Sequence, residues 1–337
     1  MKEKLKQYCD LSYKMNKDKN DDIKSELNNI LLELKQEAMM KFEKESDIKK
    51  FLDNVCYFNN YSYNNQLLIY MQNVNATYVT SFKKISEMGY KVNKAEEGIK
   101  ILIPSFLRLV KIKASGNEEI KLYKDLTKEE IKKYRNQFDQ DIIFHKDVLT
   151  HFKIGTVFDI SQTNMPITKI KNELDPILEN SSADDIINIF IKTIYRDGYK
   201  IEFKNIDNGS KGYCNHQNKV ITIREDLSNL MKLKVLVHEY AHSLAHYHLE
   251  NNNKEYQNNR NKYETEAEGI AYVVCKYLGL DTMNYSVNYL YAWSKEKNFV
   301  EIDNSLEIIV KESNKIINNF KKMNEKEYDL YDQKTLN

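Results

Sequence analysis

The amino-acid sequence predicts an α+β protein, in which an N-terminal part combines helices with a small sheet and a C-terminal part is mainly helical. Strands of one sheet are predicted by β-branched and apolar runs in the first half, at 99–103, 106–112 and 154–160. Helices are predicted by apolar residues at helical spacing in the second half, over 229–249, 262–279, 285–297 and 303–323. Because 337 residues exceed what one core normally requires, we expect two domains.

The bulk composition excludes several classes of protein. Hydrophobic residues make up 41% and charged residues 30%, which is typical of a packed globular protein and too apolar for a disordered chain. No run approaches the roughly 18 consecutive apolar residues of a membrane span, and Met1 is followed by lysines and glutamates rather than an apolar leader. The four cysteines lack CxxC spacing, which favours reduced thiols. We expect a cytoplasmic protein with no membrane partner.

The remaining elements are placed by local pattern. An amphipathic helix is predicted over 23–42, and the aromatic, Asn-rich block 57–65 runs into an apolar helix entered from a polar turn. The charged stretch 114–147 predicts an insertion, with a loop followed by a short exposed helix. A polar segment with a proline ends at Pro166, so we expect domains at 1–165, with an N-terminal helical extension, and 166–337. Two short strands are expected at 199–203 and 219–223.

Four of the seven histidines fall in the eleven residues HEYAHSLAHYH, which begin at His238. A helix places residues i and i+4 on one face, so His238 and His242 can present imidazole nitrogens to one ion. Glu239 lies beside that face and can reach a water bound to the metal. The structural alternative is a pair of hydrogen-bonded core histidines. Apolar neighbours on the same helix favour the metal, because an ion satisfies two buried imidazoles.

A second helix offers the third ligand. Its core face is lined by Ala267, Ala271, Val274 and Leu278. Seven residues before Ala271 comes Glu264, which therefore points inward as the natural ligand of a gluzincin-type zinc site. Glu266 is a second candidate, although it should point to a different side. His248 is a third, but Ala245 stands where the HExxHxxxxxH enzymes need a glycine. A solvated first turn would also explain the acidic residues.

Two further residues are candidates for the layer around the ligands. Glu268 follows Glu264 by four residues and can accept the free ring N–H of a ligating histidine, which fixes its orientation. His246 follows His242 by four residues and is either such a supporting group or a polar residue near the helix end. With three ligands and one open position, Zn²⁺ would lower the pKa of its water toward about 7, and Glu239 would accept the proton. The sequence thus contains the apparatus for amide hydrolysis without showing that a protein substrate is cleaved.

A local excess of basic residues lies in the first half of a chain whose formal net charge is only +1. The segment 83–113 contains only three acidic residues but eight basic ones, which are Lys83, Lys84, Lys91, Lys94, Lys100, Arg108, Lys111 and Lys113. Cations beside exposed tyrosines are typical of single-stranded DNA binding, with phosphates on the cations and bases stacked on the rings. Tyr57, Tyr61 and Tyr63 are the candidate stacking residues. Lysines at strand edges also prevent aggregation, which is the structural alternative.

The order of these motifs resembles a known family. HEYAHSLAH followed by ETEAEGIAYVVCKYLGL resembles the metallopeptidase-like domains of the ImmA/IrrE class, in the version found in ArdC-type antirestriction proteins of plasmids and conjugative elements. The segments NYSYNNQLLI, ATYV, GYKV, EGIKI and VFDISQT look like the single-stranded-DNA-binding domain of that family. The resemblance extends from about Asn60 to Trp293 and includes Asn64, which joins the candidate DNA contacts.

The resemblance implies roles for particular residues. It implies His238, His242 and Glu264 as zinc ligands, Glu239 as the catalytic acidic residue, and protection of incoming DNA from host restriction during conjugation. The sequence departs from the family where a tryptophan is usual, since Phe82 and Ile85 stand in that region, and in its long insertion. Two alternatives stay open: an ImmA-like regulatory protease that cleaves a repressor, and a DNA-binding protein whose zinc is purely structural.

Overall fold

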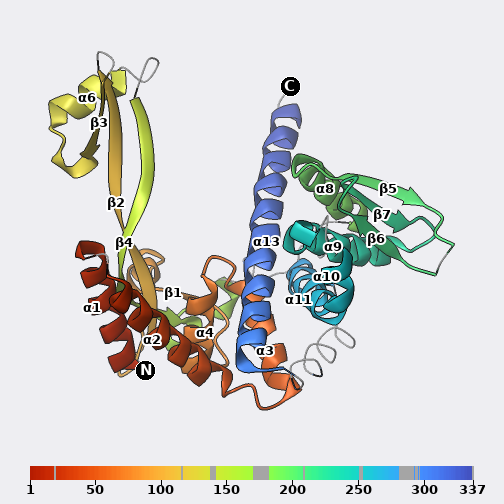
Figure 1. The fold of residues 1–337 in the computed structure, drawn as a ribbon, viewed down its shortest axis with the longest axis horizontal. Coiled ribbons are helices and arrows are strands. Elements are labelled where there is room, and N and C mark those ends of the chain that lie inside the picture. Colours follow the sequence, from red (N-terminus) through yellow and green to blue (C-terminus); the bar gives the residue numbers. More distant parts are fainter. Residues whose placement is uncertain are drawn as a thin grey trace. The chain divides into compact units, whose positions relative to one another are not determined.

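The computed structural model describes residues 1–18, 20–114, 117–136, 142–169, 182–207, 209–249, 253–280 and 297–335, with the single residues Ala292 and Lys295 (Figure 1). Its contacts define two compact units, one of residues 1–34 and 100–157 and the other of residues 35–99 and 158–337. Each unit combines two stretches of chain, so the units do not test a single cut in the sequence. The predicted division at residue 165 stays a prediction. Within the described residues, every helix is too short or too polar to cross a membrane.

The first unit is built on a long β-ribbon with a helix beside it. Its elements are α1 (Lys2–Lys17), the start of α2 (Asp21–Met39), β2 (Ile99–Ala114), β3 (Asn117–Leu122), a 3-10 turn (Tyr123–Asp125), α6 (Lys128–Asn136) and β4 (Ile142–Asp159). The hydroxyl of Ser12 on α1 accepts a hydrogen bond from the backbone N–H of Phe152 on β4, at 3.0 Å. The ring of Tyr8 lies 5.8 Å from that of Phe152. These contacts hold α1 against β4.

The predicted strands do lie in one sheet, with the order β1-β4-β2-β3, where β1 is Val79–Ser81. The runs 99–103 and 106–112 were expected to be separate strands, and this was wrong, because β2 continues through Pro104. The antiparallel partner β3 pairs with β2 only from Leu109 onward. Pro104 therefore lies where β3 makes no ladder, so its missing N–H costs no hydrogen bond on that side.

The charged insertion differs in part from the expectation. The predicted short helix is present as α6, and the loop predicted at 114–117 falls largely outside the described residues. The stretch also contains strand that was not expected, because β3 pairs antiparallel with β2 and β4 begins as early as Ile142. Charged side chains do not prevent strand formation at a sheet edge, where they face water and block pairing with other molecules. Composition alone therefore misassigned this stretch.

The second unit holds most of the helices. They are α3 (Glu45–Tyr57), α4 (Tyr63–Gln72), α5 (Phe82–Glu87), α8 (Ala183–Arg196), α9 (Asn229–Ala245), α10 (Asn253–Asn258), α11 (Arg260–Leu278) and α13 (Phe299–Thr335), with 3-10 turns at Ile160–Gln162, Ile167–Lys169 and Tyr247–Leu249. The predicted C-terminal helices correspond to α9, α11 and α13, and α4 begins after a polar turn, as expected. The helix predicted over 285–297 falls almost entirely outside the described residues.

A three-stranded sheet and two layers of helix position the C-terminal site. The sheet consists of β5 (Lys200–Lys204), β6 (Gly212–Asn215) and β7 (Val220–Arg224) in the order β5-β7-β6, with β5 parallel and β6 antiparallel to β7. Helix α9 packs on β6 and β7 with one face and on α11 with another, and α11 in turn packs on α13 and α3. The site is thus built on rigid elements.

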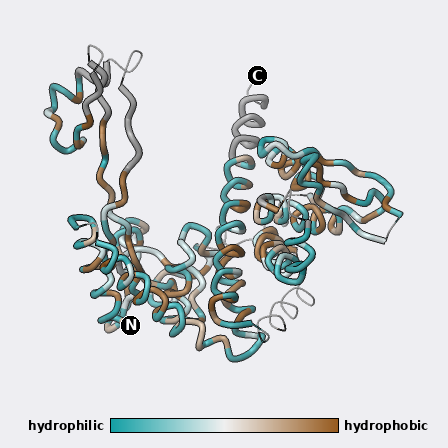
Figure 2. Tube along the Cα trace, viewed as in Figure 1, coloured by the Kyte–Doolittle hydropathy of each residue, from teal (hydrophilic) through white to brown (hydrophobic). Residues whose placement is uncertain are grey.

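Helix ends and close contacts fix the positions of α9 and α11. The Ser228 hydroxyl caps the start of α9, and Gly279, at a φ of 85°, ends α11. A side chain on Gly269 would place its Cβ 2.5 Å from Ile309 Cδ1, so the glycine lets α11 approach α13 closely. Figure 2 shows hydrophobic and hydrophilic residues alternating along the described part of α13, as a helix with one buried side requires.

Candidate metal centre

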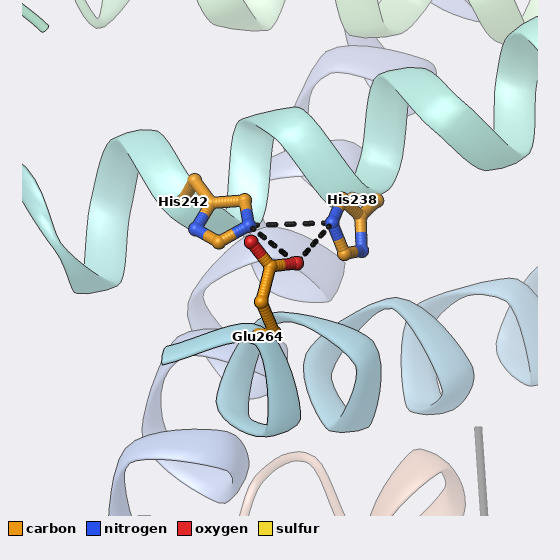
Figure 3. A group of neighbouring side chains, drawn as sticks. All are labelled: His238, His242 and Glu264. Atoms are coloured by element: carbon orange, nitrogen blue, oxygen red, sulfur yellow. Dashed lines mark hydrogen bonds and ion pairs between the residues drawn. The ribbon is translucent and has the colours of Figure 1, made fainter. Parts of the chain in front are cut away.

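Two turns of α9 and the start of α11 bring three potential ligands together. The Nε2 atoms of His238 and His242 lie 3.2 Å apart. Glu264 Oε2 lies 3.6 Å from the first of these nitrogens and 3.7 Å from the second (Figure 3). Within the described residues, these three form the one group of His, Cys, Asp or Glu side chains with metal-ligand spacing. The sequence placed all three on facing helices, and the structure brings them together.

The spacing of these atoms fits a small divalent ion. A tetrahedral zinc with ligands at about 2.0–2.1 Å separates neighbouring ligand atoms by about 3.3 Å. The three measured separations, 3.2, 3.6 and 3.7 Å, lie close to that value. A hydrogen bond between two core histidines would explain the shortest separation alone. The nearly equal approach of a carboxylate oxygen to both nitrogens is what a shared ion requires, and the donor set suits a divalent metal.

The electrostatics favour the forms of these residues that bind metal. Burial lowers the pKa of His242 to about 4, so its imidazole is neutral at pH 7. Burial raises the pKa of Glu264, but its contacts with His238 and His242 outweigh this and hold the pKa well below its usual range. For His238, burial lowers the pKa. The hydrogen bond to Glu264 and the charges of Glu239 and Glu268 raise it by more, so that the pKa lies above its usual value. A metal ion therefore competes with a proton more strongly at His238 than at His242.

Glu239 lies next to the ligands and against the edge strand β6. Its side chain is buried, and burial raises its pKa to about 7, although the charge on His238 lowers it. The backbone N–H of Cys214 on β6 donates a hydrogen bond to its carboxylate. A Cβ on Gly212 would lie 2.6 Å from Val235 Cγ1 and 3.3 Å from Glu239 Cγ. Glycine at this position thus allows β6 to approach the side chain that the sequence predicts as general base.

The close contact at Gly212 yields a stability prediction. Replacing Gly212 by alanine is expected to lower the free energy of unfolding by about 1–3 kcal/mol, because Val235 is stiff at χ1 and cannot move aside cheaply. That loss corresponds to roughly 2–10 °C in Tm, measured by calorimetry. The double variant Gly212→Ala/Val235→Ala relieves the closest contact and leaves those with the Thr222 carbonyl oxygen at 3.0 Å and Glu239 Cγ at 3.3 Å, so it should lose less stability than the sum of the two single variants. If the two substitutions lower the free energy of unfolding in a strictly additive way, Gly212 and Val235 are not in close contact and the prediction is wrong.

A cleft of about 1070 Å³ opens onto the three ligands and Glu239. One wall is β6 with the following His216, and the other includes Tyr256 and Arg260. Because β6 is the edge strand of its sheet, no further strand of the described residues pairs with it. The cleft therefore exposes an extended backbone alongside the candidate metal ligands.

Two of the neighbouring residues lie close to the candidate ligands. His246 Nδ1 is 2.9 Å from His242 Nδ1. Glu268 Oε1 is 3.5 Å from His238 Nδ1, which is an ion-pair distance, and that nitrogen has no hydrogen-bond partner, so the predicted hydrogen bond from the ring to Glu268 is not formed. Glu266 does not join the ligand group. It points to a different side of α11, as expected, and contacts His246 there. The side chain of the alternative ligand His248 lies outside the described residues.

Comparison with known families now identifies the chain. A model of the N-terminal domain of the anti-restriction factor ArdC matches residues 21–158, and a model of the IrrE N-terminal-like domain matches residues 192–275. The chain is an ArdC-type protein. The second model includes both histidines and Glu264. The expected family, its two kinds of domain and the α+β fold are therefore confirmed.

Other similar proteins add context to the ArdC-type assignment. An uncharacterized protein of Bacillus anthracis is 26% identical over 299 residues, which cover 83% of this chain and 49% of the relative. The chain thus spans about half the length of that curated relative. The metal-free crystal structure of antirestriction ArdC from plasmid R388 superposes with a TM-score of 0.42 at 16% identity, covering 78% of this chain and 85% of that one. Its Mn(II)-bound form gives 0.41 at 16% identity, with 79% and 86% covered.

The tyrosines predicted to stack on bases in this ArdC-type protein are less exposed than expected. Tyr63 is only 6% exposed and donates a hydrogen bond to Asp303 at 2.8 Å, so the prediction of an exposed ring is wrong for this residue. Tyr57 and Tyr61 are half-buried, and the hydroxyl of Tyr61 donates to the carbonyl of Val79. Asn64 is also half-buried, with a buried Oδ1 that has no hydrogen-bond partner. The sequence pattern did not reveal that these rings pack inward.

The predicted basic residues are mostly exposed. Lys83, Lys84, Lys91 and Lys94 are exposed and belong to the second unit, whereas Lys100 is half-buried, belongs to the first unit and donates to Thr156. Next to Lys83, the ring of Phe82 is 58% exposed and meets Phe158 at 6.4 Å. Phe82 is therefore an exposed aromatic ring beside two exposed lysines, and the sequence-based prediction did not include it. The sequence did contain one indication of an aromatic residue here, because Phe82 stands in the region where the family usually has a tryptophan.

The sequence analysis also missed two residues that line the cleft beside the candidate metal ligands. The hydroxyl of Tyr256 donates to Glu264 Oε1 at 3.0 Å, leaving the other carboxylate oxygen toward the histidines. His216 lines the opposite wall, 3.3 Å from the hydroxyl of Tyr199. Neither residue stands at motif spacing from HExxH, so the sequence carried no signal for them beyond the presence of a polar aromatic side chain.

Proposed function

We propose that this ArdC-type antirestriction protein acts for a mobile element, binds single-stranded DNA and holds Zn²⁺ in a peptidase-type site. The observation that carries the proposal is the convergence of His238, His242 and Glu264, with Glu239 beside them, on one open cleft. A site with three protein ligands and an open position is the arrangement of catalytic rather than structural zinc. The proposed ligands are therefore the two histidines and Glu264.

The cleft residues are suited to amide hydrolysis. Zinc bound here would supply Lewis-acid polarisation of a carbonyl and activation of a water molecule. Glu239, with a pKa of about 7, can accept the proton and return it to the leaving amine. The edge strand β6 offers backbone hydrogen bonds to an extended segment of a protein substrate. These features support peptidase chemistry, and the substrate class they favour is an unfolded or flexible peptide.

The metal proposal predicts a stability change on loading. Zinc at about 1,000 times its Kd stabilises the folded state by about 4.1 kcal/mol, which corresponds to an increase in Tm on the order of 10 °C. Removal by EDTA should reverse the increase. A competition titration should show weaker binding of Mn²⁺ than of Zn²⁺, because two imidazoles favour the later transition metal. A protein that melts at one temperature with and without zinc would contradict the proposed site.

The DNA-binding proposal rests on the exposed lysines and Phe82. In the sequence, the ring lies next to Lys83 and Lys84, and Lys91 and Lys94 follow within twelve residues. Cations contact phosphates and an exposed ring stacks on a base, which together give binding with little sequence preference. Lys83 is 3.6 Å from Glu87 in an exposed ion pair, which contributes little and leaves the lysine available. Tyr63 has no role in the proposed surface.

Substituting two of these lysines tests the surface. For Lys83→Ala/Lys84→Ala, the plot of log K against log salt for a labelled oligonucleotide should flatten by about 1.4, since each lost phosphate contact on a single strand removes about 0.7. Fluorescence polarisation at several salt concentrations measures this slope. The control variant Lys311→Ala/Lys315→Ala removes two exposed lysines of α13 and should leave the slope unchanged. Equal slopes for both variants, or tighter binding of duplex than of single strand, would contradict the proposal.

A further inference from the structure

A buried chain of hydrogen bonds runs from the candidate ligand His242 away from the cleft. His242 Nδ1 lies 2.9 Å from His246 Nδ1, and His246 Nε2 lies 3.0 Å from Glu266 Oε2. The other oxygen of Glu266 accepts a hydrogen bond from Ser305 Oγ at 2.7 Å, with Lys262 Nζ 3.8 Å away. The chain thus links α9, α11 and α13.

The members of this chain are shielded from water. His246, Glu266 and Ser305 are each 0% exposed, and His242 is 5% exposed. A buried carboxylate strongly destabilises the folded state unless it is hydrogen-bonded or paired with a charge. Packing alone does not require an acid at this position, and an apolar residue would avoid the cost. The arrangement therefore points to a function for the carboxylate at this depth.

The hydrogen bonds determine where the ring protons lie. The Nε2 atom of His242 faces His238 and Glu264, so it must be unprotonated to bind an ion. The proton of His242 then sits on Nδ1 and is donated to Nδ1 of His246. His246 must accept at that atom, so its own proton sits on Nε2 and is donated to Glu266. One carboxylate thus fixes the tautomers of two imidazoles in series.

We propose that Glu266, acting through His246, is a positioning residue that holds His242 in the tautomer and orientation a metal ion needs and strengthens binding of the ion by its negative charge. The inference rests on the metal site proposed above. Partners of this kind orient ligating histidines and increase their basicity, and their loss commonly weakens metal affinity by about 10- to 100-fold. Here the carboxylate acts through an intervening imidazole rather than on the ligand directly.

The test is the zinc affinity of the full-length chain, measured by chelator competition. Glu266→Gln keeps an oxygen that can accept from His246 but removes the charge, so the Kd should rise at least tenfold. Glu312→Gln is the matched control, because Glu312 is another buried glutamate, on α13, whose ion pairs are with Lys311 and Lys315. Its Kd for zinc should match that of the unaltered protein.

A second measurement does not depend on the variant being folded. In the ¹⁵N spectrum of histidine-labelled, unaltered protein loaded with zinc, His242 should carry its proton on Nδ1 and His246 on Nε2. A proton on Nδ1 of His246, or an unchanged Kd in folded Glu266→Gln, overturns the inference while leaving the metal site intact. If the unaltered protein binds no zinc at all, the metal site itself fails.

Discussion

Replacing His242 by alanine is expected to weaken zinc binding about a hundredfold. The residue contributes one of three ligand atoms and is also the point at which the buried chain to Glu266 reaches the metal site. Structural zinc sites bind with about 10–16 kcal/mol over four ligands, so one ligand represents on the order of 3 kcal/mol, or about a hundredfold in affinity. Loss of the buried hydrogen bond to His246 adds about 1–3 kcal/mol of destabilisation.

The measurement is a zinc titration against a competing chelator, combined with melting curves. His216→Ala serves as the control, because that histidine lines the same cleft but lies outside the ligand group. Its zinc affinity should change less than threefold. At the zinc concentration that stabilises the unaltered protein by about 4.1 kcal/mol, a hundredfold larger Kd leaves about 1.4 kcal/mol, so His242→Ala should keep only about a third of the zinc-dependent increase in Tm. Tight zinc binding by folded His242→Ala would place the ion elsewhere and contradict the account.

Replacing Glu239 by glutamine is expected to remove peptidase activity while retaining the metal. Glutamine has nearly the same shape, but it cannot accept the proton that hydrolysis requires, and general bases commonly contribute about 10²- to 10⁴-fold to the rate. The side chain is not one of the three ligands, so zinc content should remain at one ion per chain. Mass spectrometry of cleavage products from a peptide library measures the rate.

The same variant separates the alternative functions. If Glu239→Gln cleaves no peptide and also fails to protect DNA from restriction, peptidase chemistry underlies the antirestriction role. If it protects DNA as well as the unaltered protein does, the zinc only stabilises the fold. A regulatory protease would lose cleavage in this variant and show no binding of single-stranded DNA in either form. Equal cleavage rates in both forms would exclude Glu239 as the general base.

The candidate metal ligands could be predicted because their geometry is local to two helices. The four-residue spacing of His238 and His242 places both rings on one side of a helix, whatever the rest of the fold does. Glu264 followed from the seven-residue spacing to Ala271, which is fully packed in the structure. Helical periodicity thus identifies which residues can converge, and it needs no knowledge of the intervening chain.

The residues that the sequence misjudged depend on partners far away in the chain. Tyr63 stands in a polar, Asn-rich block that suggests exposure, yet its hydroxyl is bonded to Asp303, 240 residues later. Glu266 was expected to point away from the candidate ligands, and this is confirmed. The sequence did not show that its carboxylate is buried and hydrogen-bonded to Ser305 and His246. The charged hairpin β2–β3 was misassigned because strand pairing, rather than composition, decides its structure. Such long-range contacts leave no periodic trace in the sequence.

X-ray absorption at the zinc edge tests the central claim most directly, because it reports the ligands of the ion itself. The account predicts one zinc per chain, with two imidazole nitrogens at about 2.0–2.1 Å, a carboxylate oxygen at about 2.0–2.2 Å and no sulfur. The spectrum should lose one imidazole in His238→Ala. A zinc–sulfur distance of about 2.3 Å, or a pure, folded protein that takes up no zinc, would contradict the account.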